Sequence, residues 1–377
     1  MNPDPGAEPR PSSRGFPRAG PLTIAIAGAT GAVGRELCWI LSERDFPVGR
    51  LHLLAGPNSP GRKMRVLGSE RGVAPLEGFD FSGVDLAFFS CGGERSERHV
   101  PRALDAGALV IDNSSAFRMD RDVPLVVPEC NEHALFRTDG GPASSLIANP
   151  NCSTILMALV LAPLHRAFGL RRVIAATYQA ASGAGARALA ALEEDLAAGF
   201  DGGVPRGEAW RGRFPHPLAG NLIPQIDRFL EDGSTREEWK MEVETRKILD
   251  LPDLRVEACC VRVPVLRSHA EALVLETDRE CPPLEARRVL EEAPGLSVVD
   301  DRETFLYPMP LETSGRDEVQ VGRIRASRAF RNGLSLFLAG DQIRKGAALN
   351  AVQIAECLLR ASRGDSAPRD PDSRVTP

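Results

Sequence analysis

The chain has 377 residues, which is enough for two domains with sizeable hydrophobic cores. Hydrophobic residues make up 43% of it and charged residues 26%, as in an ordinary globular protein. The formal net charge of −5 argues against a general nucleic-acid-binding surface. Eight cysteines without regular spacing indicate neither a disulfide framework nor a metal site. We therefore expect a cytoplasmic protein that binds no metal, nucleic acid or membrane.

Both ends of the chain have the composition of disordered segments. Residues 1–20 are rich in proline and lack the apolar stretch that a signal peptide needs. Residues 363–377 are polar and contain three prolines. No apolar run in between approaches the length of a membrane span. We predict a disordered arm over 1–20 and a disordered tail over 363–377.

A glycine-rich turn follows the first predicted strand. Residues 22–27 are an apolar run, GATGAVG follows directly, and a helix pattern follows through Leu37, Ile40 and Leu41. A strand, a glycine-rich turn and a helix in this order can seat a dinucleotide pyrophosphate on the helix N-terminus. The same pattern can also form a tight turn that binds no ligand. We predict a dinucleotide site because the pattern directly follows the first strand. The expected cofactor contacts are Gly28, Thr30, Gly31, Ala32, Val33 and Gly34.

The second predicted strand, 51–55, is followed by no acidic residue. An NAD site would place an Asp or Glu there to hold the ribose hydroxyls. Small polar residues and two cations follow instead, which favours NADP. We predict that Ser59 and Arg62 contact its 2′-phosphate, although Arg62 and Lys63 could also be solvated loop charges.

Two further buried strands, 84–89 and 109–112, end in polar or glycine-rich turns. Strands that alternate with helical stretches give a parallel sheet with ligands at the strand C-termini. We therefore predict an α/β fold with a Rossmann-type dinucleotide-binding domain. Ser90, Gly92 and Gly93, which follow the first of these strands, are expected near the nicotinamide half of the cofactor.

Residues 148–154 read ANPNCST, and an apolar helix pattern begins directly after them. Backbone N–H groups in a first helical turn have no partners within the helix, and the dipole there favours negative charge. Such a position lowers the pKa of a thiol and offers N–H groups to an oxyanion. Cys152 is therefore a candidate nucleophile. The alternative is that it is a small buried apolar residue, as many free cysteines are.

Several motifs occur in one order between residues 21 and 362. They are GATGAVG, SCGG, DNSSAFR (112–118), VPECN (127–131), ANPNCST (148–154), TYQAASGAG (177–185), EEWKMEVETRKIL (237–249), CVRVPV (260–265), Ser268-His269 and IRKGAALNAVQIAE (343–356). Together they resemble the aspartate-β-semialdehyde dehydrogenase family. That family interconverts L-aspartate 4-semialdehyde and L-aspartyl 4-phosphate with NADP(H) and phosphate, in the biosynthesis of lysine, threonine, methionine and diaminopimelate.

The resemblance implies a role for residues that mean little alone. Cys152 resembles the nucleophile, His269 the acid/base and Gln179 the amide that orients the substrate. The resemblance implies that Arg262 binds the substrate α-carboxylate and Glu237 its ammonium. It implies that Arg118 and Lys240 bind the phosphate and that Asn151 is a further substrate contact. It also adds Ser182, Gly183 and Asn350 to the cofactor site. Taken alone, Glu237 and Lys240 would be an exposed helical ion pair.

One departure concerns the cofactor. The family commonly carries Ser and Arg in the loop after the second strand, where this chain has Gly56 and Asn58. Ser59, Arg62 or Lys63 would have to substitute for them. We expect the preference for NADP to be weaker as a result.

The implied architecture has two domains. An NADP-binding domain is expected over 21–150, completed by a C-terminal helix at 341–362. Residues 151–340 are expected to form an α+β catalytic and dimerisation domain with a mixed sheet. Its apolar strands at 171–177 and 257–265 would cover a subunit interface in a homodimer or homotetramer.

Two other functions compete. A reductase for N-acetyl-γ-glutamyl phosphate uses the same thiol and nicotinamide chemistry, but its substrate has no free ammonium for Glu237 to bind. A non-catalytic paralogue would be expected to lose the thiol, the histidine or the arginine. This chain keeps all three, so the semialdehyde dehydrogenase is our prediction.

Overall fold

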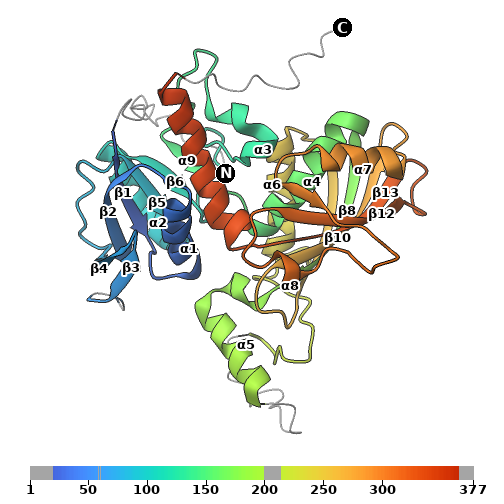
Figure 1. Cartoon of the computed structure of the whole chain (residues 1–377), viewed down its shortest axis with the longest axis horizontal. Helices are drawn as coiled ribbons and strands as arrows, with labels where there is room; N and C mark the ends of the chain where they lie inside the picture. The colour runs from blue at the N-terminus through green and yellow to red at the C-terminus, as the bar shows by residue number, and fades with distance from the viewer. Residues whose placement is uncertain (1–19, 58, 60, 199–213, 365–377) are drawn as a thin grey trace.

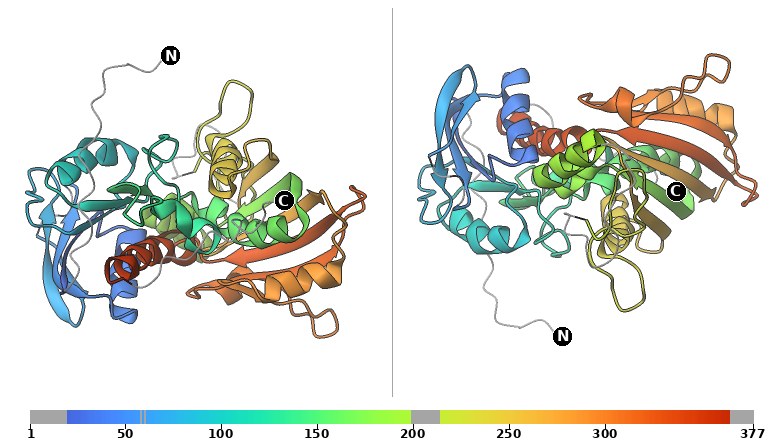
Figure 2. Two further views of the ribbon diagram at one scale, coloured as in Figure 1. Left: turned by 90° about the horizontal axis from the view of Figure 1, so that it is seen from above. Right: turned by 90° about the horizontal axis from the view of Figure 1, so that it is seen from below.

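The computed structural model describes residues 20–57, 59, 61–198 and 214–364. The predicted N-terminal arm and C-terminal tail therefore lie almost entirely outside the described residues. The described chain forms two β-sheets, with helix α9 (Leu349–Ser362) running between them (Figure 1). Figure 2 shows the sheets at opposite ends of the molecule.

The first sheet has seven strands in the order β3-β4-β2-β1-β5-β6-β7. They are β1 (Leu22–Ala27), β2 (Val48–Ala55), β3 (Lys63–Val66), β4 (Ser69–Pro75), β5 (Leu86–Phe89), β6 (Leu109–Asp112) and β7 (Leu146–Ala148). Neighbouring strands from β4 to β7 are parallel, and the β3–β4 hairpin is antiparallel. Strands β5 and β6 are buried throughout, which explains their unbroken apolar sequences. The predicted parallel sheet is confirmed, whereas the β3–β4 hairpin was not predicted.

Helices α1 (Ala32–Glu43) and α2 (Gly93–Asp105) follow β1 and β5. Helix α9 shares one buried apolar cluster with α1 and the strands β1, β2 and β5. A π-helical turn, Arg344–Ala348, leads into α9. The predicted C-terminal helix therefore packs against the first sheet, as expected.

The second sheet has six strands in the order β11-β12-β13-β10-β8-β9. They are β8 (Leu170–Gln179), β9 (Arg255–Arg262), β10 (His269–Thr277), β11 (Leu296–Val298), β12 (Val319–Ala326) and β13 (Gly333–Gly340). The pairs β8–β9 and β11–β12 are parallel and the others antiparallel, so the predicted mixed sheet is confirmed. The remaining helices are α3 (Pro128–Asn131), α4 (Cys152–Phe168), α5 (Ala186–Ala198), α6 (Arg236–Leu249), α7 (Pro283–Glu291) and α8 (Pro310–Thr313).

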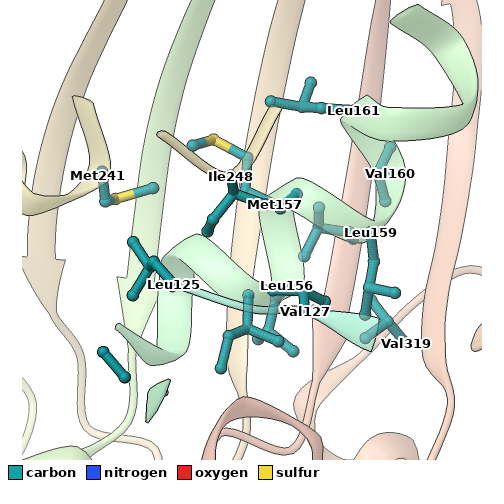
Figure 3. Close-up of a cluster of buried hydrophobic side chains, with 14 of the residues drawn as sticks. Leu125, Val127, Leu156, Met157, Leu159, Val160, Leu161, Met241, Ile248 and Val319 are labelled. Carbon is teal, nitrogen blue, oxygen red and sulfur yellow. The ribbon is translucent and has the colours of Figure 1, made fainter. Parts of the chain in front are cut away.

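Helix α4 connects the two halves of the fold. Its residues from Ser153 to Ala162 are all buried, which explains why this helix is apolar on every side. Leu156, Met157 and Leu159 lie in one cluster with side chains of α6 and of the second sheet (Figure 3). The same cluster includes residues of β1, β5 and β6. The first turn of α4 is therefore held between the strand ends of the first sheet and the inner face of the second.

The outer face of the second sheet carries exposed apolar side chains. Ile174 and Tyr178 of β8 are 44% and 38% exposed, and Val173 and Gln179, whose side chains point to the other face, are buried. The Tyr178 ring lies 6.1 Å from that of Phe337 on β13. An exposed apolar sheet face of this kind is typical of a protein–protein interface.

Candidate active site

The glycine turn after β1 is built by close backbone contacts. Gly28 has a φ of +93°, and a Cβ there would lie 2.3 Å from the carbonyl oxygen of Ser90. A Cβ on Gly34 would lie 2.2 Å from the carbonyl oxygen of Gly28. Larger residues would force the turn away from the strand ends, so glycine is required. The turn thereby places the N-terminus of α1 close to the end of β1 and to Ser90, which follows β5.

The second glycine-rich turn lies directly beside the first. Ser90 follows β5, and its carbonyl is the group that Gly28 approaches. Gly92, with a φ of +88°, is the N-cap of α2, and Gly93 is its first residue. The structure therefore brings together the predicted cofactor residues of both turns: Gly28, Thr30, Gly31, Ala32, Val33, Gly34, Ser90, Gly92 and Gly93.

A groove of about 730 Å³ lies between α1 and β3, next to the glycine turn. Its lining includes Thr30 and four cationic side chains, which are Arg35, Arg62, Lys63 and Arg65. The Ser59 hydroxyl lies 3.4 Å from that of Thr30, at the same end. Ser59 and Arg62 were predicted to contact the 2′-phosphate of the cofactor. Arg35 and Arg65 were not predicted as cofactor residues. Asn58, one of the two departures from the family pattern, lies outside the described residues.

Cys152 is the first residue of α4, as predicted. Asn151 is the N-cap, and its side-chain oxygen accepts a hydrogen bond from Thr154 N at 3.2 Å. Burial and the neighbouring Glu237 carboxylate raise the pKa of the Cys152 thiol to about 12. The predicted lowering of this pKa is therefore wrong. Burial disfavours the thiolate more than the charges of Arg262 and Arg118 favour it.

Glu237 lies at the centre of a buried hydrogen-bond network beside the thiol. Its Oε1 accepts from Asn151 Nδ2 at 2.9 Å and from Gln179 Nε2 at 3.0 Å. Its Oε2 accepts from Lys240 Nζ at 3.1 Å. These partners hold the pKa of the Glu237 carboxyl below its usual value against the effect of burial. Glu237 is therefore a buried anion whose orientation is fixed.

Arg262 and His269 are held by the same backbone residue. Arg262 Nη1 donates to the Ala180 carbonyl at 2.6 Å, and Ala180 N donates to His269 Nδ1 at 3.0 Å. Both side chains lie over Gly183, where a Cβ would come within 3.0 Å of Arg262 Nη1 and 3.1 Å of His269 Nε2. Arg262 forms no ion pair with any described residue. It is a buried guanidinium without a carboxylate partner in the described chain.

The loop before His269 is also tethered. Ser268 is buried with a φ of +73°, and its N–H donates to Gln342 Oε1 at 2.7 Å. Gln342 Nε2 donates to the hydroxyl of Ser182 at 2.5 Å. Ser182, predicted as a cofactor residue, is therefore linked to the histidine loop by Gln342, which the sequence did not indicate.

Arg118 has three protein partners. Its guanidinium donates to the carbonyls of Asn149 and Asn113 at 2.9 and 2.8 Å, and to Glu244 Oε1 at 2.9 Å. Glu244 Oε2 in turn accepts from Asn151 N at 2.6 Å. Lys240, the other predicted phosphate ligand, contacts Asp227 at 2.8 Å in addition to Glu237. Each of the two cations thus has its own carboxylate partner on α6.

The structure adds to the sequence interpretation at two residues. Glu244 was missed, although it lies seven residues after Glu237 and so on the same helical face. Asn350 was predicted to contact the cofactor, yet it is fully buried and bonded to protein groups. Its Nδ2 donates to Asn149 Oδ1 at 2.7 Å and its Oδ1 accepts from Lys345 at 3.1 Å. These bonds tie Asn350 to Asn149, and its contact with the cofactor stays a prediction.

Comparison with known proteins identifies the family of this chain. The model described as "Semialdehyde dehydrogenase, NAD binding domain" matches residues 23–138, and "Semialdehyde dehydrogenase, dimerisation domain" matches residues 161–345. The aspartate-semialdehyde dehydrogenase of Aquifex aeolicus is 48% identical over 89% of this chain and 98% of that protein. A crystal structure of aspartate semialdehyde dehydrogenase II complexed with ASA from Vibrio cholerae is 41% identical. It has a TM-score of 0.84 and covers 91% of this chain and 99% of that one.

The fold extends to more distant proteins. An aspartate semialdehyde dehydrogenase structure with NADP from Candida albicans has a TM-score of 0.68 at 23% identity, over 91% of this chain and 99% of that one. The matches to the Aquifex aeolicus and Vibrio cholerae proteins cover 89% and 91% of this chain. The chain therefore belongs to the aspartate-semialdehyde dehydrogenase family.

Proposed function

We propose that the chain catalyses the reversible reductive dephosphorylation of L-aspartyl 4-phosphate to L-aspartate 4-semialdehyde, as a step of amino-acid biosynthesis. The observation that carries the proposal is the pair of opposite charges beside the Cys152 thiol. Arg262 is a buried cation without a carboxylate partner among the described residues, and Glu237 is a buried anion. Buried charges are costly unless they are paired. A substrate with an α-carboxylate supplies the anion that Arg262 lacks, and its α-ammonium adds a cation beside Glu237, whose Oε2 already accepts from Lys240.

Each side chain then has a definite task. Cys152 attacks the substrate carbonyl to form a covalent thioester or thiohemiacetal. Gln179 and Asn151 orient Glu237 and the reacting group, since both donate to the Glu237 carboxylate. Arg262 grips the α-carboxylate with a planar fork that a lysine cannot reproduce. Lys240 and Arg118 supply positive charge for the phosphate.

The glycine turns fit a dinucleotide. A Cβ at Gly28 would collide with the Ser90 carbonyl and one at Gly34 with the Gly28 carbonyl, so both glycines are needed for the turn that leads into α1. The backbone N–H groups at the N-terminus of α1 are suited to a pyrophosphate. Gly31, Ala32 and Val33 continue this turn, and Ser90, Gly92 and Gly93 lie across from it. NADP, when bound, supplies or accepts a hydride. Ser182 and Gly183 are close to His269 and are therefore suited to the nicotinamide end.

The cationic groove next to Thr30 is our candidate for the 2′-phosphate. Replacing Arg62 or Arg35 with alanine should lower the ratio of kcat/KM for NADP to that for NAD about tenfold, because one charge-assisted contact is worth about 1.4 kcal/mol. Arg50 on β2 is exposed outside the groove, so Arg50→Ala is the matched control. An NAD preference in the native protein would refute the assignment. So would an unchanged ratio in both groove variants.

Substrate identity can be tested directly. Purified protein should reduce NADP in the presence of phosphate and aspartate semialdehyde, and much less with N-acetylglutamate semialdehyde. An acetylated substrate presents a neutral amide to the Glu237 carboxylate in place of an ammonium, so it loses that charge–charge contact. Faster turnover of the acetylated compound would favour the related reductase. No turnover of either would favour a non-catalytic paralogue.

Arg262→Lys should lower kcat/KM for the semialdehyde about 100-fold while the KM for NADP changes little. A single ammonium cannot make the bidentate contact, and a misplaced carbonyl also reacts more slowly. Arg255, at the exposed opposite end of β9, gives the control Arg255→Lys. A variant in which only the KM for NADP rises would assign Arg262 to the cofactor instead.

We further propose a homodimer in the cytoplasm. The exposed apolar side chains of Ile174 and Tyr178 lie in the part of the chain that matches the dimerisation-domain family, and a second copy would cover them. All eight cysteines are free thiols, which suits a reducing compartment. Within the described residues there is neither a helix able to cross a membrane nor a cluster able to hold a metal ion.

A further inference from the structure

We propose that Glu36 of α1 is a positioning residue, which keeps the helix that follows the glycine turn in register with Cys152 and His269. It acts through two arginines, Arg267 and Arg344, that belong to the segments holding these two residues. The inference rests on the proposed function, because this register matters for a reaction in which a hydride passes between a bound dinucleotide and a carbon attached to the thiol.

Glu36 lies one turn into α1 and bridges two cations. Helix α1 begins at Ala32, within the glycine turn that we assign to the dinucleotide. Glu36 Oε1 accepts from Arg344 Nη1 at 3.2 Å, and Glu36 Oε2 lies 3.1 Å from Arg267 Nη2. Each oxygen of one carboxylate therefore contacts a different arginine. Glu36 does not line the cationic groove, so this contact is separate from the candidate 2′-phosphate site.

Arg267 forms the link to the histidine loop. It lies two residues before His269, and its Nε donates to Oδ2 of the fully buried Asp341 at 2.6 Å. Ser268, between the arginine and the histidine, donates from its backbone N–H to Gln342 Oε1 at 2.7 Å. The loop that presents His269 is thus tied both to the segment after β13 and to α1.

Arg344 forms the link to the thiol. It is buried and begins the π-helical turn that leads into α9. A Cβ on Gly346, two residues later, would lie 3.1 Å from the Cβ of Cys152, so the backbone of this turn packs directly against the first residue of α4. Turns of this kind are frequent at functional sites. A displacement of Arg344 would therefore be transmitted to the backbone beside Cys152.

Neither arginine depends on Glu36 alone for its charge balance. Arg344 also donates to Asp317 and, at 2.6 Å, to Glu43 Oε2. Arg267 keeps its bond to the segment after β13. Neutralising Glu36 therefore leaves no buried cation without an anion, and the fold should tolerate it. Among the described residues, Glu36 is the acidic residue of α1 that contacts Arg267, so its loss removes the direct bond between α1 and the histidine loop.

Hydride transfer is sensitive to such a bond. The reacting atoms must approach to about 3–3.5 Å, and a misplacement of about 1 Å can cost about 100-fold in rate. The N-terminus of α1 lies beside the first sheet, whereas the histidine loop belongs to the second. A carboxylate bonded to both halves at 3.1 and 3.2 Å restricts their relative movement.

Glu36→Gln removes the charge and keeps the size of the side chain. The kcat for phosphate-dependent semialdehyde oxidation should fall about tenfold or more, while the KM values for NADP and semialdehyde change less than about twofold, because Glu36 contributes to register and not to binding. Glu356→Gln is the matched control. It removes an ion pair between α9 and Arg44, at the C-terminal end of α1, and should keep the wild-type kcat. An unchanged kcat in Glu36→Gln, or an equal loss in the control, would overturn the proposal.

Alkylation of Cys152 by iodoacetamide gives a readout that requires no turnover. Without cofactor, the rates in the wild type and in Glu36→Gln should agree within about twofold, because the surroundings of the thiol are the same. Saturating NADP should slow the wild-type reaction about fivefold or more, and the variant less than half as much, because the two sites are then less strongly coupled. Equal protection in both proteins would refute the proposal. So would rates that already differ without cofactor, since the defect would then lie in the thiol site itself.

Urea unfolding separates positioning from folding. Both variants should unfold at the wild-type urea concentration. A midpoint that falls together with kcat in Glu36→Gln alone would assign Glu36 a structural role and refute the proposal. If Glu36→Gln does not fold, Glu36→Asp takes its place, because it keeps the charge but is one methylene too short to contact both arginines. If the wild type oxidises no semialdehyde, the proposed function fails, and the effect of NADP on alkylation still reports on Glu36.

Discussion

Replacing Cys152 with alanine or serine is expected to abolish phosphate-dependent oxidation of aspartate semialdehyde. The thiol is the group at the N-terminus of α4 able to form a thioester, and it lies beside Glu237 and Arg262. Serine has nearly the same size but is a far weaker nucleophile at neutral pH. Less than about 1% of the wild-type kcat should remain in either variant, a loss that corresponds to about 2.7 kcal/mol or more. The measurement is the initial rate of NADPH formation at saturating substrate.

Folding and cofactor binding are the controls for this prediction. Both variants should bind NADP with the wild-type affinity and unfold at the same urea concentration, since the side chain adds little to the core. Cys259, exposed on β9, gives Cys259→Ser as a matched variant that should keep full activity. If Cys152→Ala kept more than a few per cent of the rate in an uncontaminated preparation, the covalent mechanism would be wrong.

The position of Cys152 could be predicted from the sequence, but its ionisation could not. ANPNCST followed by an apolar run locates the residue at the start of a helix, because Asn151 is a good N-cap and the run is helical. The pKa depends on which groups surround the sulfur. Glu237 comes from α6, 85 residues further along the chain, and burial comes from tertiary packing.

In the first sheet, too, only some of the elements could be predicted from the sequence. Its central strands were predictable because strands buried on both faces are unbroken apolar runs. The β3–β4 hairpin lies at the sheet edge, where most of its residues are exposed and its strands are not apolar runs. Its turn has positive φ at Leu67 and Gly68. Such a turn usually has Asn-Gly or Asp-Gly at these positions, and leucine rarely adopts a positive φ. The sequence Leu-Gly therefore gave no signal for a hairpin turn.

The candidate site was predicted mainly from the family resemblance. Arg262 and Glu237 have no local signal that separates them from a strand residue and a helical ion pair. Glu244 was missed because acidic residues on α6 alternate with cations, as on any solvated helix. The structure shows that the buried face of α6 includes Glu237, Met241 and Glu244. Glu244 could therefore have been found as an acidic residue at a helix position where the periodicity predicts a buried apolar residue.

Glu244→Gln is expected to destabilise the fold by about 3–5 kcal/mol, the usual effect of removing one partner from a buried ion pair. Arg118 and Glu244 are both buried, and they are joined at 2.9 Å. Glutamine is isosteric but leaves the Arg118 cation without an anion. It also weakens the bond to Asn151 N, the residue that caps α4 ahead of Cys152. Unfolding in urea, followed by fluorescence and by circular dichroism, measures the change.

Glu242 on the same helix supplies the comparison. It pairs with Arg246 at 2.8 Å at the surface, so Glu242→Gln should cost less than about 1 kcal/mol. Adding Arg118→Met to Glu244→Gln should recover part of the lost stability, because the unpaired charge is then removed. It should not recover activity, since Arg118 also provides positive charge near the thiol. If Glu244→Gln were as stable as Glu242→Gln, the buried pair would not be what holds α6 against the start of α4.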